Sequence, residues 1–169
     1  MFKMSEKLVN LESLSLEKNQ LEYFDSSSLE KLDSLNLNCN PLKSNIFNSS
    51  LLPCFQNLIE LKLVNCKLAE INSEAFFHLS SLNYLFLSNN KLKLENTDVF
   101  RYLINLKYLC LEYNELEYLT IEQGLFSPLK SLENLDLFHN KISKITKNMF
   151  KDLLNLRQLF ISNNPIDFK

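Results

Sequence analysis

Residues that could perform acid–base or nucleophilic chemistry are few in this chain of 169 residues. Asp136 and His139 stand three residues apart and resemble half of a catalytic triad, but no serine or cysteine is placed to complete it. The other histidine, His78, is expected on the opposite side of the molecule. Zinc-protease, Cys-x-x-Cys and nucleophile-elbow motifs are absent, and the single glycine cannot form a phosphate-binding loop. The sequence therefore predicts a protein that is not an enzyme and that has no cofactor and no metal site.

Leucines organise the chain, because they recur in the pattern L-x-x-L-x-L-x-x-N-x-L. Seven copies begin at Leu11, Leu32, Leu58, Leu82, Leu106, Leu132 and Leu156. The steps between successive copies are 21, 26, 24, 24, 26 and 24 residues. One unit of this length cannot bury its own leucines, so neighbouring units stack and share a continuous core. The pattern thus predicts one repetitive domain over residues 1–169.

Each position of the pattern has an expected role. The L-x-L core should form a short strand whose side chains alternate, so that Leu85 and Leu87 point inward and Phe86 points outward. The ninth position is Asn in six copies and Cys66 in the third, and it stands where the chain turns away from the strand. We expect these Asn side chains to bind backbone groups left unpaired at the turn and to stack as a ladder.

The second half of each unit is also patterned. Phe76, Phe100, Phe126 and Phe150 each stand six residues before a repeat start, so their rings are expected to pack against the core from the convex side. Repeat four departs from the pattern, because Glu95 stands where other repeats have an apolar residue. A local irregularity is therefore expected between Leu92 and Val99.

This pattern resembles the leucine-rich repeat, and its 24-residue form with Phe resembles the "typical" subclass of Toll-like receptor ectodomains, small proteoglycans and Slit-like guidance proteins. The resemblance extends from about Leu8 to Ile166. It implies an α/β fold, a solenoid in the shape of a curved horseshoe arc. A parallel β-sheet would line the concave face, and short 3-10 or loop segments the convex face. It also implies binding to other macromolecules, most often outside the cell.

Composition and the chain ends restrict the possible functions. A net charge of −2 argues against nucleic acid as a partner, and no apolar run approaches the ~18 residues of a membrane span. Residues 1–7 contain no apolar segment typical of a signal peptide. Neither end carries the cysteine-rich cap of the extracellular relatives. We therefore expect an uncapped repeat domain that is part of a longer protein.

The four cysteines, Cys39, Cys54, Cys66 and Cys110, are predicted to be free thiols. Cys39 and Cys110 should face outward three strands apart, a separation of roughly 14 Å at ~4.8 Å per strand. A disulfide needs Cα atoms within about 7 Å. Free thiols favour a cytoplasmic location, whereas the family resemblance implies an extracellular or cell-surface one.

The outward positions of the strands can vary without disturbing the core, and they form the predicted binding face. From repeat four onward these positions become rich in aromatic and acidic side chains. The predicted ligand-binding residues are Tyr84, Phe86, Tyr108, Glu112, Tyr113, Asp136, Phe138, His139 and Phe160. Exposed aromatic side chains of this kind gather at recognition surfaces. The alternative is that they shield the strand backbone or pack against a part of the parent protein.

Three functions remain open at this stage. The first is a non-enzymatic module of the receptor, adhesion or signalling type, which binds a protein ligand with apolar anchors and some basic residues on its concave face. The second is an intracellular leucine-rich repeat scaffold or regulatory subunit. The third is the repeat portion of an enzyme or kinase.

Overall fold

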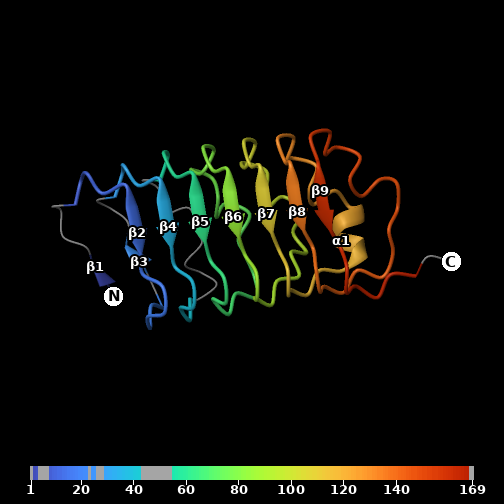
Figure 1. Ribbon diagram of the computed structural model, residues 1–169, viewed down its shortest axis with the longest axis horizontal. Coiled ribbons are helices and arrows are strands. Elements are labelled where there is room, and N and C mark those ends of the chain that lie inside the picture. The colour runs from blue at the N-terminus through green and yellow to red at the C-terminus, as the bar shows by residue number, and fades with distance from the viewer. Residues whose placement is uncertain (1, 4–7, 23, 26–28, 43–54, 168–169) are drawn as a thin grey trace.

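The computed structural model describes residues 2–3, 8–22, 24–25, 29–42 and 55–167, and it contains a parallel sheet of seven short strands in chain order (Figure 1). The strands are β2 (Ser13–Ser15), β4 (Ser34–Asn36), β5 (Glu60–Lys62), β6 (Tyr84–Phe86), β7 (Tyr108–Cys110), β8 (Asn134–Asp136) and β9 (Gln158–Phe160). This is the predicted solenoid fold, with one strand for each repeat. A second, two-stranded parallel sheet of β1 (Phe2–Lys3) and β3 (Phe24–Asp25) was not predicted.

The repeat leucines set the register of the sheet. The central residue of every strand is a leucine, and each pairs with the leucine of the next strand, as Leu85 pairs with Leu109 and Leu109 with Leu135. These three leucines have no exposed surface. The first and last strands, β2 and β9, each pair on one side only, so Leu14 is only partly buried and Leu159 is 38% exposed.

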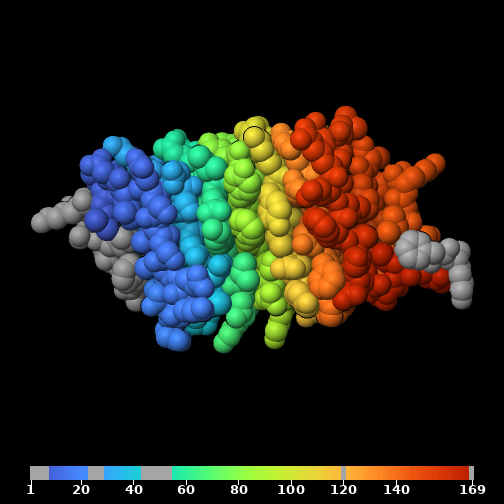
Figure 2. All heavy atoms as spheres, viewed as in Figure 1, coloured from blue at the N-terminus to red at the C-terminus, as the bar shows by residue number. Residues whose placement is uncertain are grey.

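Each repeat forms a separate band across the molecule, and the bands follow one another without mixing (Figure 2). A phenylalanine stack connects the bands on the side opposite the sheet. The ring centroids of Phe76 and Phe100 are 6.2 Å apart, those of Phe100 and Phe126 are 6.3 Å apart, and those of Phe126 and Phe150 are 6.4 Å apart. The first three rings are fully buried and Phe150 is half-buried, which confirms the predicted packing of this row.

The asparagine ladder is also confirmed. The Nδ2 group of Asn114 donates to the carbonyl oxygens of Leu87 (2.9 Å) and Leu111 (3.1 Å), and its Oδ1 accepts from the Leu92 amide at 3.0 Å. Asn90 and Asn140 make the equivalent bonds in their own repeats. Each ladder residue thus joins the carbonyls of two successive repeats, which holds neighbouring turns at a fixed spacing.

A second polar row, which the sequence analysis missed, occupies the position just before four of the repeat starts. The Nδ2 groups of Asn57, Asn105 and Asn155 donate to the carbonyl oxygens of residues 30, 80 and 130 in the preceding repeats, at 3.0, 2.9 and 2.8 Å. The Ser131 hydroxyl donates in the same way to the Ile104 carbonyl at 2.8 Å. The recurrence of Asn or Ser directly before the repeat leucine was the available signal.

Two repeats have irregular second halves. The predicted irregularity in repeat four is present, because Leu94 adopts a left-handed conformation (φ 54°) and is buried in place of the apolar residue that Glu95 replaces. Repeat five, which is 26 residues long, contains the α-helix α1 (Tyr118–Glu122). This short helix was not predicted; the other described connections of this side are turns and loops, in line with the expectation of short 3-10 or loop segments. The longer step supplies the residues that complete a helical turn.

Cys66 interrupts the asparagine ladder. Its thiol is fully buried and donates to the Leu37 carbonyl at 3.3 Å, but it offers no amide to the neighbouring backbone. The Leu42 amide, which would face a ladder oxygen here, bonds instead to the Asn40 carbonyl at 2.8 Å. The Ile166 amide makes the same bond to Asn164, where no further repeat follows in the described chain.

We expect Cys66→Asn to raise the free energy of unfolding at neutral pH by about 1 kcal/mol, because the new amide can donate to the Leu37 and Leu63 carbonyls. The pH dependence should change as well, because burial raises the pKa of the Cys66 thiol from its ordinary value of 9.0 to about 11. The folded wild type keeps a proton that the unfolded chain loses. The contribution of this thiol to the stability of the wild type is therefore fully present below pH 9. It is lost as the pH rises from 9 to about 11.

Urea unfolding of both proteins across this pH range measures the effect. The difference in unfolding free energy should widen by about 2–3 kcal/mol above pH ~9, since the variant has no thiol to titrate. Other groups also titrate in this range, but they are common to both proteins. A difference that stays constant with pH would contradict the assignment.

Candidate protein-binding surface

The nine predicted ligand-binding residues lie on the outer surface of the sheet and on the turns that follow its strands. Tyr84 and Tyr108 are paired on β6 and β7, as predicted. Phe86, Cys110, Asp136 and Phe160 form one row across β6 to β9. We call the aromatic residues of this surface the aromatic face; they are Tyr84, Phe86, Tyr108, Tyr113, Phe138, His139 and Phe160.

The rings of the aromatic face gather into two groups. Phe86 and Tyr108 contact each other at a centroid distance of 5.2 Å, at the level of the strands. Beyond the carboxyl ends of the strands, the Tyr113 ring packs on Phe138 at 5.4 Å and on His139 at 4.7 Å. The predicted alignment of Tyr113 with His139 is therefore confirmed. Contacts of this kind hold the rings in fixed orientations.

Exposure differs among these side chains. Tyr84 and Tyr113 are each 42% exposed and Phe160 is 49% exposed. Phe86, Tyr108, Phe138, Glu112 and Asp136 are half-buried, and His139 is exposed. The aromatic face thus exposes ring surface, and several of its rings contact one another. Phe160 lies apart from the ring contacts above, on the last strand.

Cys110, which was predicted to face outward, is buried, and so is the nearby Ser88. Cys110 and Ser88 are only 4% and 3% exposed, and Ser88 Oγ lies 3.0 Å from Cys110 Sγ within hydrogen-bonding distance. The exposure of Cys110 was predicted wrongly, because residue spacing alone does not reveal that a small side chain is covered by larger neighbours. Cys39 was also placed on a strand, but it follows β4, is half-buried and lies in a turn with φ 58°.

A recurrent left-handed turn positions Tyr113 and His139. The eighth position of the pattern has a positive φ in all seven repeats, with values of 53° at Tyr113 and 52° at His139. Asn occupies this position in three repeats and tolerates the conformation well, but a tyrosine there is uncommon. The turn directs these two rings outward just before the buried ladder asparagines. The asparagines of the other repeats were the signal that the sequence analysis missed.

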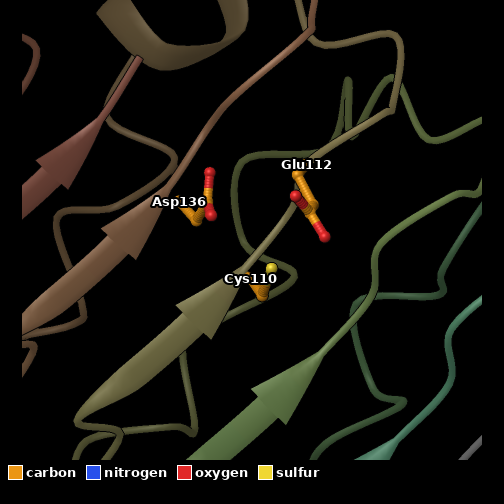
Figure 3. Close-up of side chains that lie close together, drawn as sticks. All are labelled: Cys110, Glu112 and Asp136. Atoms are coloured by element: carbon orange, nitrogen blue, oxygen red, sulfur yellow. The ribbon is translucent and has the colours of Figure 1, made fainter. Parts of the chain in front are cut away.

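An acidic cluster, Glu112 and Asp136 with Cys110 beside them, lies at the ends of β7 and β8 (Figure 3). Donor atoms of Cys110, Glu112 and Asp136 all lie within 4.8 Å of one another. One Asp136 carboxylate oxygen accepts from the Phe138 amide at 2.9 Å. Burial, and then the nearby Cys110 and Asp136, raise the pKa of the Tyr108 phenol to about 12, so this hydroxyl stays protonated at physiological pH.

The geometry does not assemble a catalytic site from these groups. Burial raises the pKa of the Cys110 thiol, which is paired with Ser88 rather than with a base. The ring of His139 packs on Tyr113, and the ring of His78 packs on Phe77 at 4.7 Å in the second half of repeat three. Thiol and imidazole are therefore each committed to other contacts.

Lys62 borders the aromatic face on β5. Its ammonium group lies 5.7 Å from the centroid of the Phe86 ring and 2.9 Å from a Glu60 carboxylate oxygen. The Glu60 carboxylate also accepts from the Ser34 hydroxyl at 2.9 Å. The sheet surface therefore changes from an ion-paired polar region over β4 and β5 to an aromatic and acidic region over β6 to β9.

The described cysteines, Cys39, Cys66 and Cys110, are free, and Cys54 lies outside the described residues. Cys39 and Cys110 belong to repeats whose strands, β4 and β7, are three apart in the sheet, as predicted. Within the described part of the chain, no helix combines the length and apolar character needed to cross a membrane.

Comparison with known proteins decides the family. The family model described as leucine rich repeat matches residues 56–116 and 117–166, which together make up more than half of the chain. The chain belongs to the leucine-rich repeat family. A search of curated protein sequences found no significant match.

Two solved internalin structures from Listeria monocytogenes str. 4b F2365 resemble this leucine-rich repeat protein. Internalin C2 is 27% identical, with a TM-score of 0.75, and the match covers 96% of this chain and 66% of internalin C2. A second internalin, inlF, is 25% identical, also with a TM-score of 0.75, and the match covers 96% of this chain and 44% of inlF. The chain therefore spans less than two thirds of each of these proteins.

Proposed function

We propose that this leucine-rich repeat chain is a non-enzymatic recognition module of the receptor or adhesion type that binds a protein ligand through its aromatic face. The observation that carries the proposal is the exposure of Tyr84, Tyr113 and Phe160 on the outer surface of a rigid sheet. A solvated surface gains nothing from such rings, whereas a partner that covers them buries a large apolar area at low entropic cost.

The proposal extends to the "typical" subclass and to an extracellular or cell-surface location. The 24-residue steps and the stack from Phe76 to Phe150 support the subclass. The location rests on the resemblance to that subclass. The free thiols of Cys39, Cys66 and Cys110 favour the second candidate, an intracellular scaffold or regulatory subunit.

Replacing Tyr84, Tyr108 and Phe138 together by alanine tests the proposed function. We expect recovery of bound proteins by the immobilised chain to fall at least about tenfold, because aromatic anchors at the centre of an interface dominate binding energy. Capture from a cell-surface fraction and from cytosol, each quantified by mass spectrometry, measures the loss and separates the two locations.

The matched control is the triple replacement of Phe77, Ile104 and Leu154 by alanine. These side chains are 47%, 54% and 86% exposed and lie outside the sheet. Circular dichroism should show both variants folded. The same proteins recovered in equal amounts by the Tyr84, Tyr108 and Phe138 variant would overturn the proposal.

A further inference from the structure

The carboxylates of Glu112 and Asp136 have no counter-ion among the described residues. Other acidic side chains nearby are paired, such as Glu133 with Arg157 at 3.5 Å and Glu115 with Lys141 at 2.8 Å. Among the described residues, no lysine, arginine or histidine forms an ion pair with Glu112 or Asp136. Two half-buried negative charges close together repel each other, and a cation from outside would relieve that repulsion.

Aromatic residues are neighbours of both carboxylates. Tyr108 lies on β7, Tyr113 directly follows Glu112 beyond the end of this strand, and the Phe138 amide donates to Asp136 at 2.9 Å. Tyr108 is in contact with Phe86, and Tyr113 is in contact with Phe138, so each ring has a support. Figure 3 shows Asp136 at the end of β8 and Glu112 just beyond the end of β7, with Cys110 below them on β7. The surface around the two carboxylates is therefore anionic and carries aromatic side chains.

The chemistry of the cluster favours an organic cation over a metal ion. Cys110 would bind a metal as a thiolate, but its thiol is 4% exposed and hydrogen-bonded to Ser88, and burial raises its pKa. One oxygen of Asp136 is already engaged by the Phe138 amide. A metal would thus find few free ligands. A guanidinium group is planar, can bridge two carboxylates, and stacks on aromatic rings.

We propose that Glu112 and Asp136 bind the guanidinium group of an arginine that the protein partner presents, with its plane and aliphatic stem against Tyr108, Tyr113 and Phe138. This inference rests on the proposed function and names the chemistry of the partner. The arginine enters at the carboxyl ends of β7 and β8, where the side chains of the partner can reach both carboxylates. A partner segment without arginine or with its charge removed binds more weakly at this point.

The test uses N-acetyl-arginine amide and N-acetyl-citrulline amide as probes, because citrulline has nearly the same shape without the charge. Each is titrated into ¹⁵N-labelled protein, and amide chemical shifts are followed. The arginine amide should shift the signals of residues 110–113 and 136–139, and the citrulline amide should not. In the Glu112→Gln, Asp136→Asn variant the dissociation constant of the arginine amide should rise at least about tenfold.

Glu133→Gln is the matched control, because Glu133 lies on the same repeat as Asp136 and is already paired with Arg157. The dissociation constant of the arginine amide for the Glu133→Gln variant should equal the wild-type value. The Asn introduced at 136 can still accept from the Phe138 amide, so the turn is preserved, and the dispersion of the spectrum verifies folding. Equal shifts with both probes would overturn the inference, as would unchanged binding by the double variant.

A titration with zinc chloride alone separates the metal alternative. Shifts at residues 110, 112 and 136 with zinc, and none with the arginine amide, would show a metal site and overturn the inference. The proposed function is tested separately. If the aromatic triple variant loses its protein partner while the Glu112→Gln, Asp136→Asn variant keeps it, the arginine site is wrong and the recognition function stands.

Discussion

Phe100→Ala is expected to lower the free energy of unfolding by about 3–5 kcal/mol, which is the typical cost of removing a fully buried phenylalanine. Phe100 has no exposed surface and lies between the rings of Phe76 and Phe126, at centroid distances of 6.2 and 6.3 Å. The neighbouring rings belong to other repeats and are held by their own backbones. These rings can therefore fill little of the cavity that Phe100→Ala leaves, so most of the expected loss in the free energy of unfolding remains.

Urea unfolding followed by circular dichroism measures this loss, with Phe77→Ala as the control. Phe77 is the next residue to a stack member, but its ring is 47% exposed and contacts Tyr102 edge-on. Its removal should cost less than about 1 kcal/mol. Phe100→Leu should fall between the two. If Phe100→Ala and Phe77→Ala lower the free energy of unfolding by similar amounts, the buried stack does not stabilise the fold more than an exposed ring does.

Asn114→Ala has the second largest expected effect, a loss of about 2–4 kcal/mol. The Asn114 amide donates to the Leu87, Leu111 and Glu112 carbonyls, and its Oδ1 accepts from the Leu92 amide. Alanine satisfies none of these buried groups. The Leu92 amide can turn to a carbonyl of its own repeat, as Leu42 does beside Cys66, which keeps the loss below the sum of four bonds.

Asn19→Ala is the control for the ladder, because the residue type and the repeat position are the same. Asn19 is exposed and bonds only to carbonyls of its own repeat, at 2.9 Å to Leu16 and 3.2 Å to Glu17. A loss below about 1 kcal/mol is expected there. Equal losses at Asn19 and Asn114, measured by urea unfolding, would mean that burial and the bond to the preceding repeat contribute nothing.

Stability and recognition are separated in this architecture. The Phe100 ring lies in the core behind β6 and β7, while Tyr84, Tyr108 and Glu112 lie on the opposite, outer side of these strands. Side chains of a strand alternate between the two sides, so the outer positions can change while the inner leucines stay. A variant of the aromatic face that loses its partner can therefore keep its fold, which makes the functional tests interpretable.

The repeat leucines, the ninth-position asparagines and the Phe row determined the fold from the sequence alone. Their roles depend on backbone geometry that every repeat shares, so spacing predicts them: the seven strands, the pairing of Tyr84 with Tyr108, and the contact of Tyr113 with His139 followed directly. The irregularity near Glu95 was also predictable from the sequence, because a charged residue cannot occupy a buried position of the repeat unless the local backbone changes.

Only the tertiary structure decided which outer side chains are covered and which groups meet. Cys110 and Ser88 occupy positions that are exposed in a generic repeat, yet larger neighbours on adjacent strands bury both. The meeting of Glu112 with Asp136 depends on side-chain direction across two strands, and the helix α1 on how two extra residues fold. These outcomes depend on contacts between repeats, whose side chains differ from one repeat to the next, whereas the pattern records only what the repeats have in common.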